Sequence, residues 1–148
     1  MKKLLFLALV FFCTTALFAQ ENPVNWKYRV EKIGNLEYNI IAEADIQDGW
    51  YMYSQYLESN DGPIPTSFDF SKNKNLSLVG KNEESGNIKK VFDKVFDMNV
   101  VKFAHKAIFT QKIKLVAATN SIVGSIEYMC CDEGMCLPPK RVPFEISL

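Results

Sequence analysis

Extended segments that alternate between apolar and polar residues run from Trp26 to Ile146, and they constrain the fold more than any other feature of the sequence. Alternation and enrichment in aromatic residues are the signals of β-strands, because successive side chains of a strand point to opposite faces. Residues 100–116 contain two such segments, one around Phe103 and one over 108–115. The other predicted strands cover residues 26–30, 38–46, 50–53, 67–70, 76–80, 122–129 and 142–146.

Turn chemistry separates these segments. Asp48-Gly49 predicts a tight turn, and Pro63 and Pro65 exclude residues 58–66 from a central strand because proline lacks the N–H that a ladder needs. Residues 81–90 are charged and polar, and we expect them to form a solvated connection. Short strands at this spacing, without a convincing amphipathic helix, predict one all-β domain, either a sandwich or a barrel.

Residues 1–19 have the order of a secretory signal peptide. Lys2 and Lys3 form a positive head, residues 4–12 are almost entirely apolar, small residues follow, and the chain turns polar at Gln20. The apolar run is shorter than the roughly 20 residues that a membrane span needs. We therefore expect cleavage after Ala19, which leaves a single domain over residues 20–148. An uncleaved membrane anchor is the alternative.

The charge balance argues against nucleic acid as a partner. The chain has 17 basic and 17 acidic residues, and losing Lys2 and Lys3 leaves 15 basic residues and a net charge of about −2. No basic stripe or face stands out, as nucleic-acid binding would require. No second apolar stretch is long enough to span a membrane, so we expect a periplasmic protein without stable membrane insertion after cleavage.

Three cysteines, Cys130, Cys131 and Cys136, lie close together near the C-terminus, in a protein whose export would allow disulfides to persist. The intervening Asp132-Glu133-Gly134 suits a tight turn, in which Gly134 tolerates positive φ. Such a turn brings Cys131 and Cys136 within the roughly 5–6 Å Cα separation of a disulfide. Cys130 would point to the opposite face of the strand and remain an extra thiol. Spacing favours the Cys131–Cys136 pair, with Cys130–Cys136 as the alternative.

A zinc site is another use for the same thiols. The three cysteines with His105 would make a Cys₃His ligand set. Adjacent Cys130 and Cys131 diverge on an extended strand, however, and His105 is far away in the sequence. We expect no metal and no cofactor, because a disulfide carries two electrons by itself.

The spacing alone does not separate a structural bridge from a reactive one. A bridge that closes about six residues is worth roughly 2 kcal/mol, only about 1 kcal/mol less than one across the sandwich. The acidic side chains of Asp132 and Glu133 disfavour a thiolate beside them. The pair therefore suits an electron relay that a partner activates, rather than a general oxidant.

Four motifs, in order along nearly the whole chain after residue 21, resemble the family of the N-terminal periplasmic domain of the thiol:disulfide interchange protein DsbD. The last motif, which contains the cysteines, is the most specific, and the earlier ones contribute mainly through their order. The motifs are Asn22-Pro23-Val24-x-Trp26, Asp48-Gly49-Trp50-Tyr51-Met52-Tyr53-Ser54, Asp61-Gly62-Pro63-Ile64-Pro65-Thr66, and Tyr128-Met129-x-Cys131-Asp132 with Cys136-Leu137-Pro138-Pro139.

The resemblance implies an immunoglobulin-like β-sandwich and an activity as the protein-disulfide reductase component of a relay. Such domains accept electrons from a membrane-embedded carrier through its thioredoxin-like domain. They pass them to periplasmic disulfide-containing proteins, including isomerases and cytochrome-maturation proteins. The resemblance makes Cys136 the sulfur that forms mixed disulfides and Cys131 the resolving partner. The membrane and thioredoxin-like domains would be separate proteins here.

The resemblance also implies an aromatic cap loop over the cysteines. Its counterpart is the segment 92–97, with Phe96 as the shielding ring and Tyr51 and Tyr53 lining the same pocket. Ordinary core packing is the alternative for each of these aromatics. Two departures from the family concern the cysteines: Cys130 is an additional thiol, and the spacing of four residues between the paired cysteines differs by one from some relatives.

A second function fits the same fold. Because fold does not fix function, the domain could be a non-enzymatic immunoglobulin-like binding module, in which the disulfide only stiffens the loop after Met129. That hypothesis predicts a bridge that resists thioredoxin-like reductants.

Overall fold

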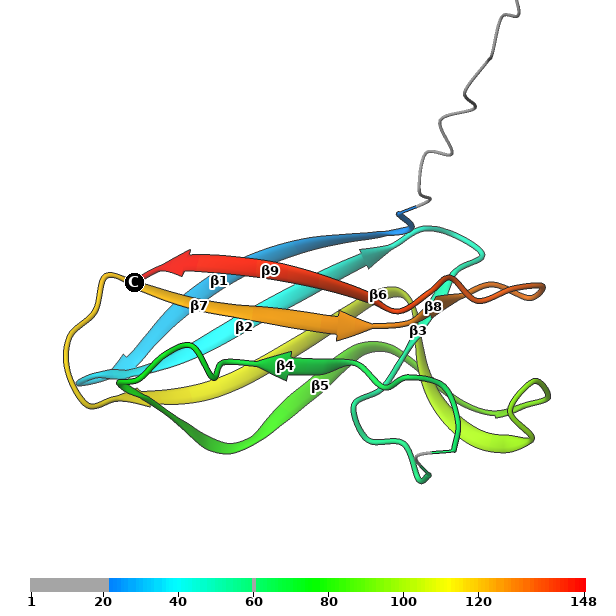
Figure 1. Cartoon of the computed structure of the whole chain (residues 1–148), viewed down its shortest axis with the longest axis horizontal. Coiled ribbons are helices and arrows are strands. Elements are labelled where there is room, and N and C mark those ends of the chain that lie inside the picture. The colour runs from blue at the N-terminus through cyan, green and yellow to red at the C-terminus, as the bar shows by residue number, and fades with distance from the viewer. Residues whose placement is uncertain (1–21, 60) are drawn as a thin grey trace, which may run out of the picture.

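The computed structural model describes residues 22–59 and 61–148, which form two β-sheets packed face to face (Figure 1). The predicted signal peptide, residues 1–19, lies outside the described residues. Within the described part of the chain there is no helix, and hence none that could cross a membrane. The strands are β1 (Val24–Gly34), β2 (Glu37–Ile46), β3 (Tyr51–Tyr53), β4 (Ser67–Asp69), β5 (Leu76–Asp93), β6 (Met98–Leu115), β7 (Ser121–Tyr128), β8 (Cys130–Cys131) and β9 (Lys140–Ser147).

The larger sheet is organised around the long strand β6. Its strand order is β1-β2-β6-β3-β8, and β5 pairs with the other side of β6. Strand β2 pairs with residues 106–114 of β6, and β3 pairs with residues 102–104, so the two share one side of the same strand. The smaller sheet has the order β4-β7-β9. All these pairings are antiparallel.

The main core fills the space between the sheets with the apolar residues of the alternating segments. The Trp26 ring packs against the Phe109 ring in the same sheet and against the Tyr128 ring in the other sheet, at centroid separations of 5.9 and 5.5 Å. Such aromatic contacts between the two layers bury a large apolar area and fix how the sheets pack against each other. The all-β domain that the alternation predicts is therefore confirmed, and of the two predicted architectures it is the sandwich. The turn at Asp48-Gly49 is also present, with Gly49 at φ 85°.

Two strand predictions are wrong. Residues 81–90, expected to be a solvated connection, belong to β5. This strand is exposed along most of its length, so it has no buried face to impose alternation on its sequence. Residues 100–115 lie in one strand rather than two, because β6 continues through His105, whose φ of 63° marks an irregularity in its middle.

The sandwich brings two hairpins together at one end (Figure 1). One is the tip of the β5–β6 hairpin, a turn over residues 94–97. The other follows β8 and contains the cysteines. Strand β3 lies between them, since Tyr51 pairs with Ala104 of β6 on one side and with Cys131 of β8 on the other. Residues 92–97 and 130–136 are thus held at one end of the larger sheet.

Candidate redox site

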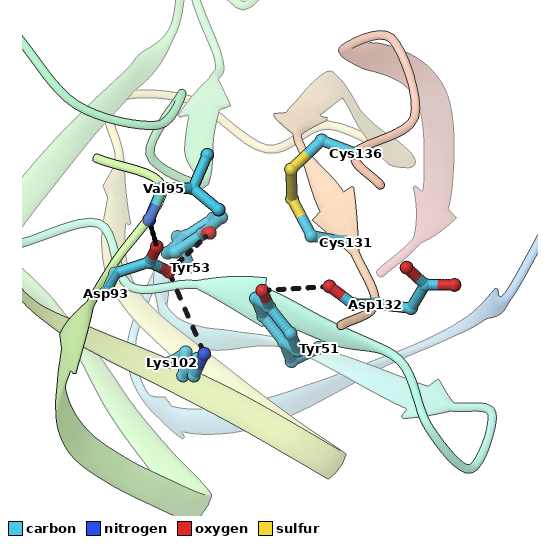
Figure 2. A network of polar contacts seen from close by, with 8 residues as sticks. All are labelled: Tyr51, Tyr53, Asp93, Val95, Lys102, Cys131, Asp132 and Cys136. Atoms are coloured by element: carbon cyan, nitrogen blue, oxygen red, sulfur yellow. Dashed lines mark hydrogen bonds and ion pairs between the residues drawn. A yellow bond between two sulfur atoms is a disulfide. The ribbon is translucent and has the colours of Figure 1, made fainter. Parts of the chain in front are cut away.

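A disulfide joins Cys131 and Cys136 across a short hairpin, with an S–S distance of 2.01 Å (Figure 2). The two residues face each other as an antiparallel bridge. Backbone hydrogen bonds flank them on both sides, from Leu137 N to Cys130 O at 2.9 Å and from Asp132 N to Met135 O at 2.9 Å. This is the non-hydrogen-bonded type of pair, in which facing residues approach most closely. The Cα separation of 4.0 Å is accordingly shorter than the separation expected from sequence.

The turn of this hairpin is held by a carboxylate rather than by a glycine in a left-handed conformation. Asp132 Oδ1 accepts hydrogen bonds from the backbone N–H groups of Gly134 and Met135, each at 2.7 Å. Gly134 itself does not have a positive φ. The side chain of an Asx turn therefore performs the role that we expected of Gly134.

Cys130 lies on the opposite face of β8 from the disulfide. Its side chain packs in the main core, whereas Cys131 packs in a second, smaller cluster with Tyr53 and Val100. The pairing favoured by spacing is the one observed, and Cys130 is a free, buried thiol. Burial raises the pKa of Cys130 to about 12, so it stays protonated and unreactive in the folded protein.

The two sulfur-bearing residues differ in access to solvent. Cys131 is completely buried, while Cys136 is half-buried and lies next to the exposed Met135. A thiolate from outside therefore reaches the bridge from the Cys136 side.

Phe96 stands in the turn between β5 and β6 and packs against the small cluster around Cys131. Its ring meets that of Tyr53 edge to face, with 6.1 Å between the centroids. Tyr53 in turn meets Tyr51 edge to face at 5.7 Å. The structure thus brings all three predicted aromatics to the disulfide, in one row from the cap turn to strand β3. Phe96 is half-buried, as a ring that lies over the cluster from the solvent side would be.

A buried carboxylate ties the cap turn to the sheet (Figure 2). Asp93 is only 4% exposed. Its Oδ1 accepts a hydrogen bond from Val95 N at 2.9 Å, and its Oδ2 accepts one from the Tyr53 hydroxyl at 3.1 Å. Lys102 Nζ lies 3.8 Å from the same Oδ2. Asp93 therefore fixes both the backbone of the turn and the ring beneath it.

Lys102 and Tyr51 continue this network to the disulfide hairpin. The Lys102 ammonium lies 3.6 Å from the centroid of the Tyr51 ring, a cation–π contact. The Tyr51 hydroxyl donates to Asp132 O at 3.1 Å. Burial raises the pKa of both Tyr51 and Tyr53, so both hydroxyls remain donors at neutral pH. A continuous set of contacts thus runs from the cap turn to the hairpin that carries the cysteines.

Sequence reasoning did not single out Asp93 or Lys102. Asp93 lies within the predicted cap segment, and an acidic residue followed by a turn is a recognisable Asx-turn signal. Lys102 offers no such signal, because only the pairing of β5, β6 and β3 places it between an aspartate and a tyrosine. His105 is exposed and lies 2.9 Å from Asp48, while Cys130 is in the core, so these two proposed zinc ligands do not converge.

Comparisons with known proteins find relatives among the thiol:disulfide interchange proteins. The model of the family described as "Thiol:disulfide interchange protein DsbD, N-terminal" matches residues 19–147. A curated relative, the thiol:disulfide interchange protein DsbD of Ralstonia nicotianae, is 28% identical over 102 residues, which are 69% of this chain. The match covers 15% of that relative, so this chain corresponds to a small part of its length.

Solved structures show the same fold. The DsbD N-terminal domain of Neisseria meningitidis, in the reduced form, has a TM-score of 0.54 and 22% identity, covering 84% of this chain and 83% of that one. The N-terminal periplasmic domain of ScsB from Proteus mirabilis has a TM-score of 0.61 and 11% identity, covering 88% of this chain and 47% of that one. At such identities the likeness shows the fold alone, an immunoglobulin-like β-sandwich.

Proposed function

Because the chain belongs to the family of the N-terminal domain of the thiol:disulfide interchange protein DsbD, we propose that it relays electrons by thiol–disulfide exchange through Cys131 and Cys136. The donor is a thioredoxin-like domain of a membrane electron carrier, and the acceptors are disulfide-containing proteins of the periplasm. Cytochrome-maturation proteins and disulfide isomerases belong to this class of acceptor. The protein acts as a protein-disulfide reductase component, exported by its signal peptide.

The exchange takes two balanced steps. A donor thiolate attacks the Cys136 sulfur, forms a mixed disulfide and releases Cys131 as a thiolate, which takes up a proton. The second donor thiolate then attacks the donor sulfur of the mixed disulfide and releases Cys136 as a thiolate. Two donor thiols are oxidised to a disulfide, and the Cys131–Cys136 bridge is reduced by two electrons. The reverse sequence, with a substrate disulfide, passes the electrons on.

The observation that carries this proposal is the unequal exposure of the two bridged cysteines beneath an aromatic cap. A bridge that only stiffened the hairpin would need neither a reachable sulfur nor a ring over it. Here Cys136 is half-buried, Cys131 is completely buried, and Phe96 packs against the same cluster. The two hydrogen bonds that flank the bridge already close the hairpin without it. We therefore favour the relay over a binding module with a structural disulfide.

Trapping of a mixed disulfide tests the proposal. A Cys131→Ser variant keeps the attacked sulfur and lacks the resolving one. With a thioredoxin-like protein whose second cysteine is replaced by serine and whose first cysteine is activated as a thionitrobenzoate disulfide, it should form a stable mixed disulfide through Cys136 and release thionitrobenzoate. A Cys136→Ser variant is the matched control, because its remaining thiols, Cys130 and Cys131, are both buried and should form far less of the adduct. Equal trapping by both variants, or by neither, would contradict the assigned roles and favour the binding module.

A further inference from the structure

An open groove of about 620 Å³ lies beside the disulfide hairpin and has an excess of cations in its walls. Lys89 from β5, Lys94 from the cap turn and Lys102 from β6 all line it. The carboxylates in its walls are Asp93, which Lys102 already pairs with, and Glu133 of the disulfide hairpin. Exposed apolar side chains of the cap, Phe92 and Val95, also line the groove.

The positions of these lysines are unfavourable for the isolated protein. Lys89 and Lys102 face each other directly across the β5–β6 ladder. Like charges at directly opposed positions of an antiparallel pair repel each other and destabilise the pairing. Lys102 has Asp93 and the Tyr51 ring to offset this repulsion, whereas Lys89 and Lys94 form no ion pair with any of the described residues. With Lys89, Lys94 and Lys102 set against Asp93 and Glu133, the lining of the groove keeps an excess of positive charge even with Glu133 counted.

We propose that this groove receives an acidic side chain of the protein that exchanges thiols with Cys136. The inference rests on the proposed relay function and adds the charge of the partner to it. The groove is too small for a domain but admits a side chain or a short segment, and Glu133 and Tyr51 connect its wall to the hairpin of the disulfide. A partner with carboxylates beside its cysteine pair would gain attraction here, and one with lysines there would be repelled.

Charge complementarity of this kind acts mainly on the rate of association and on the choice of partner. Lys89 and Lys94 are exposed, so the effect should weaken at high ionic strength. Redox encounters usually have small interfaces, in which a few charges beside the exchanging sulfurs have a large share of the contact. Lys89 and Lys94 are thus positioned to select among donors that share the same thiol chemistry.

The test uses two synthetic dithiol peptides with the same Cys-Gly-Pro-Cys core, one flanked by glutamates and the other by lysines. The rate at which each peptide reduces the Cys131–Cys136 bridge is divided by the rate for dithiothreitol with the same protein variant. The ratio of the acidic to the basic peptide is then compared between variants, which cancels the intrinsic reactivity of each peptide.

The Lys89→Glu/Lys94→Glu variant should lower this ratio at least about tenfold at low salt, and the difference should shrink when salt is raised. The matched control is Lys72→Glu/Lys74→Glu, which changes the net charge equally in the exposed β4–β5 turn at the opposite end of the sandwich (Figure 1). An equal fall in both variants, or a fall in neither, overturns the inference. Dithiothreitol is uncharged, so the groove lysines should not affect its reaction with the bridge. If dithiothreitol does not reduce the bridge, the result contradicts the relay function and not the charge of the groove.

Discussion

Cys130 and Cys131 are adjacent in the chain, yet their side chains lie in different hydrophobic clusters on opposite faces of β8. The strand geometry that separates them assigns one sulfur to the main core and the other to the disulfide. Adjacent cysteines could otherwise compete for Cys136 and scramble the bridge. The hairpin register prevents this, because only Cys131 faces Cys136.

Replacement of Cys130 should change how stability depends on alkaline pH. Its pKa is raised to about 12 from an ordinary value of 9.0, mainly by burial. The native state keeps a proton that the unfolded chain releases, so this contribution to stability is complete below about pH 9 and is lost as pH rises toward 12. Half-buried tyrosines such as Tyr28, with a pKa of about 12, act in the same direction. Urea unfolding should therefore show a shallower alkaline decline for Cys130→Ala than for the unaltered protein, by up to about 1.4 kcal/mol per pH unit.

The same variant should keep a reducible Cys131–Cys136 bridge. Iodoacetamide should label Cys130 in the unaltered protein only after unfolding, since the native thiol is buried and protonated. Fast labelling of Cys130 in the native state, or identical alkaline slopes in the two proteins, would show that the thiol is not held in the core.

Phe96→Ala should make the disulfide easier to reach. Edge-to-face packing of the kind seen between Phe96 and Tyr53 is worth about 0.5–1.5 kcal/mol. If this packing keeps the cap closed, its loss should raise the rate of reduction by dithiothreitol roughly 2- to 10-fold. Stopped-flow measurement of the reduction gives the rate directly.

Val95→Ala is the control for the Phe96 experiment, because Val95 belongs to the same turn and is 76% exposed. It should leave the reduction rate nearly unchanged. Lower stability of Phe96→Ala with no faster reduction would identify Phe96 as an ordinary core aromatic rather than a shield.

Lys102→Met should destabilise the domain, because it leaves the Asp93 carboxylate without a cation in a buried position. Lys102 is 19% exposed and its ammonium is 3.8 Å from the carboxylate, so we expect a loss of about 1–3 kcal/mol rather than the larger cost of a fully buried pair. The double variant Asp93→Asn/Lys102→Met should recover part of this loss. Denaturant unfolding of the single and double variants provides the measurement.

Lys106→Met is a suitable comparison, since Lys106 also pairs with a carboxylate, that of Glu43, but both side chains are more exposed than those of Lys102 and Asp93, at 45% and 24%. An exposed pair of this kind is worth about 0–1 kcal/mol. A loss for Lys102→Met no greater than that for Lys106→Met would mean that the network around Asp93 does not stabilise the cap turn.

The strands with one buried face were predictable from the sequence, and the long exposed strand was not. In β7 and β9 the core imposes alternation, and the predicted bounds differ from the observed ones by no more than two residues. In β5 only Asn82 and Asp93 are buried, so hydrogen bonding to β6, rather than side-chain burial, determines its extended conformation. Such a strand cannot be distinguished from a solvated loop until its neighbour is known.

The candidate site was predictable where local chemistry determines it. Facing positions in a short hairpin identify Cys131 and Cys136, and strand alternation separates Cys130 from them. The groove lysines were not predictable, because their proximity depends on the register between β5 and β6. Residues 89 and 102 become neighbours only through that pairing, which includes two register shifts.

The reduction potential of the Cys131–Cys136 bridge tests the central claim most directly. The purified protein is equilibrated in glutathione or dithiothreitol buffers, and the two thiols are mapped by mass after alkylation. The relay requires a potential within reach of thioredoxin-like donors, above about −300 mV, with Cys131 and Cys136 labelled together. A bridge that stays closed far below about −300 mV, where structural disulfides lie, would contradict the relay and leave a binding domain with a structural disulfide.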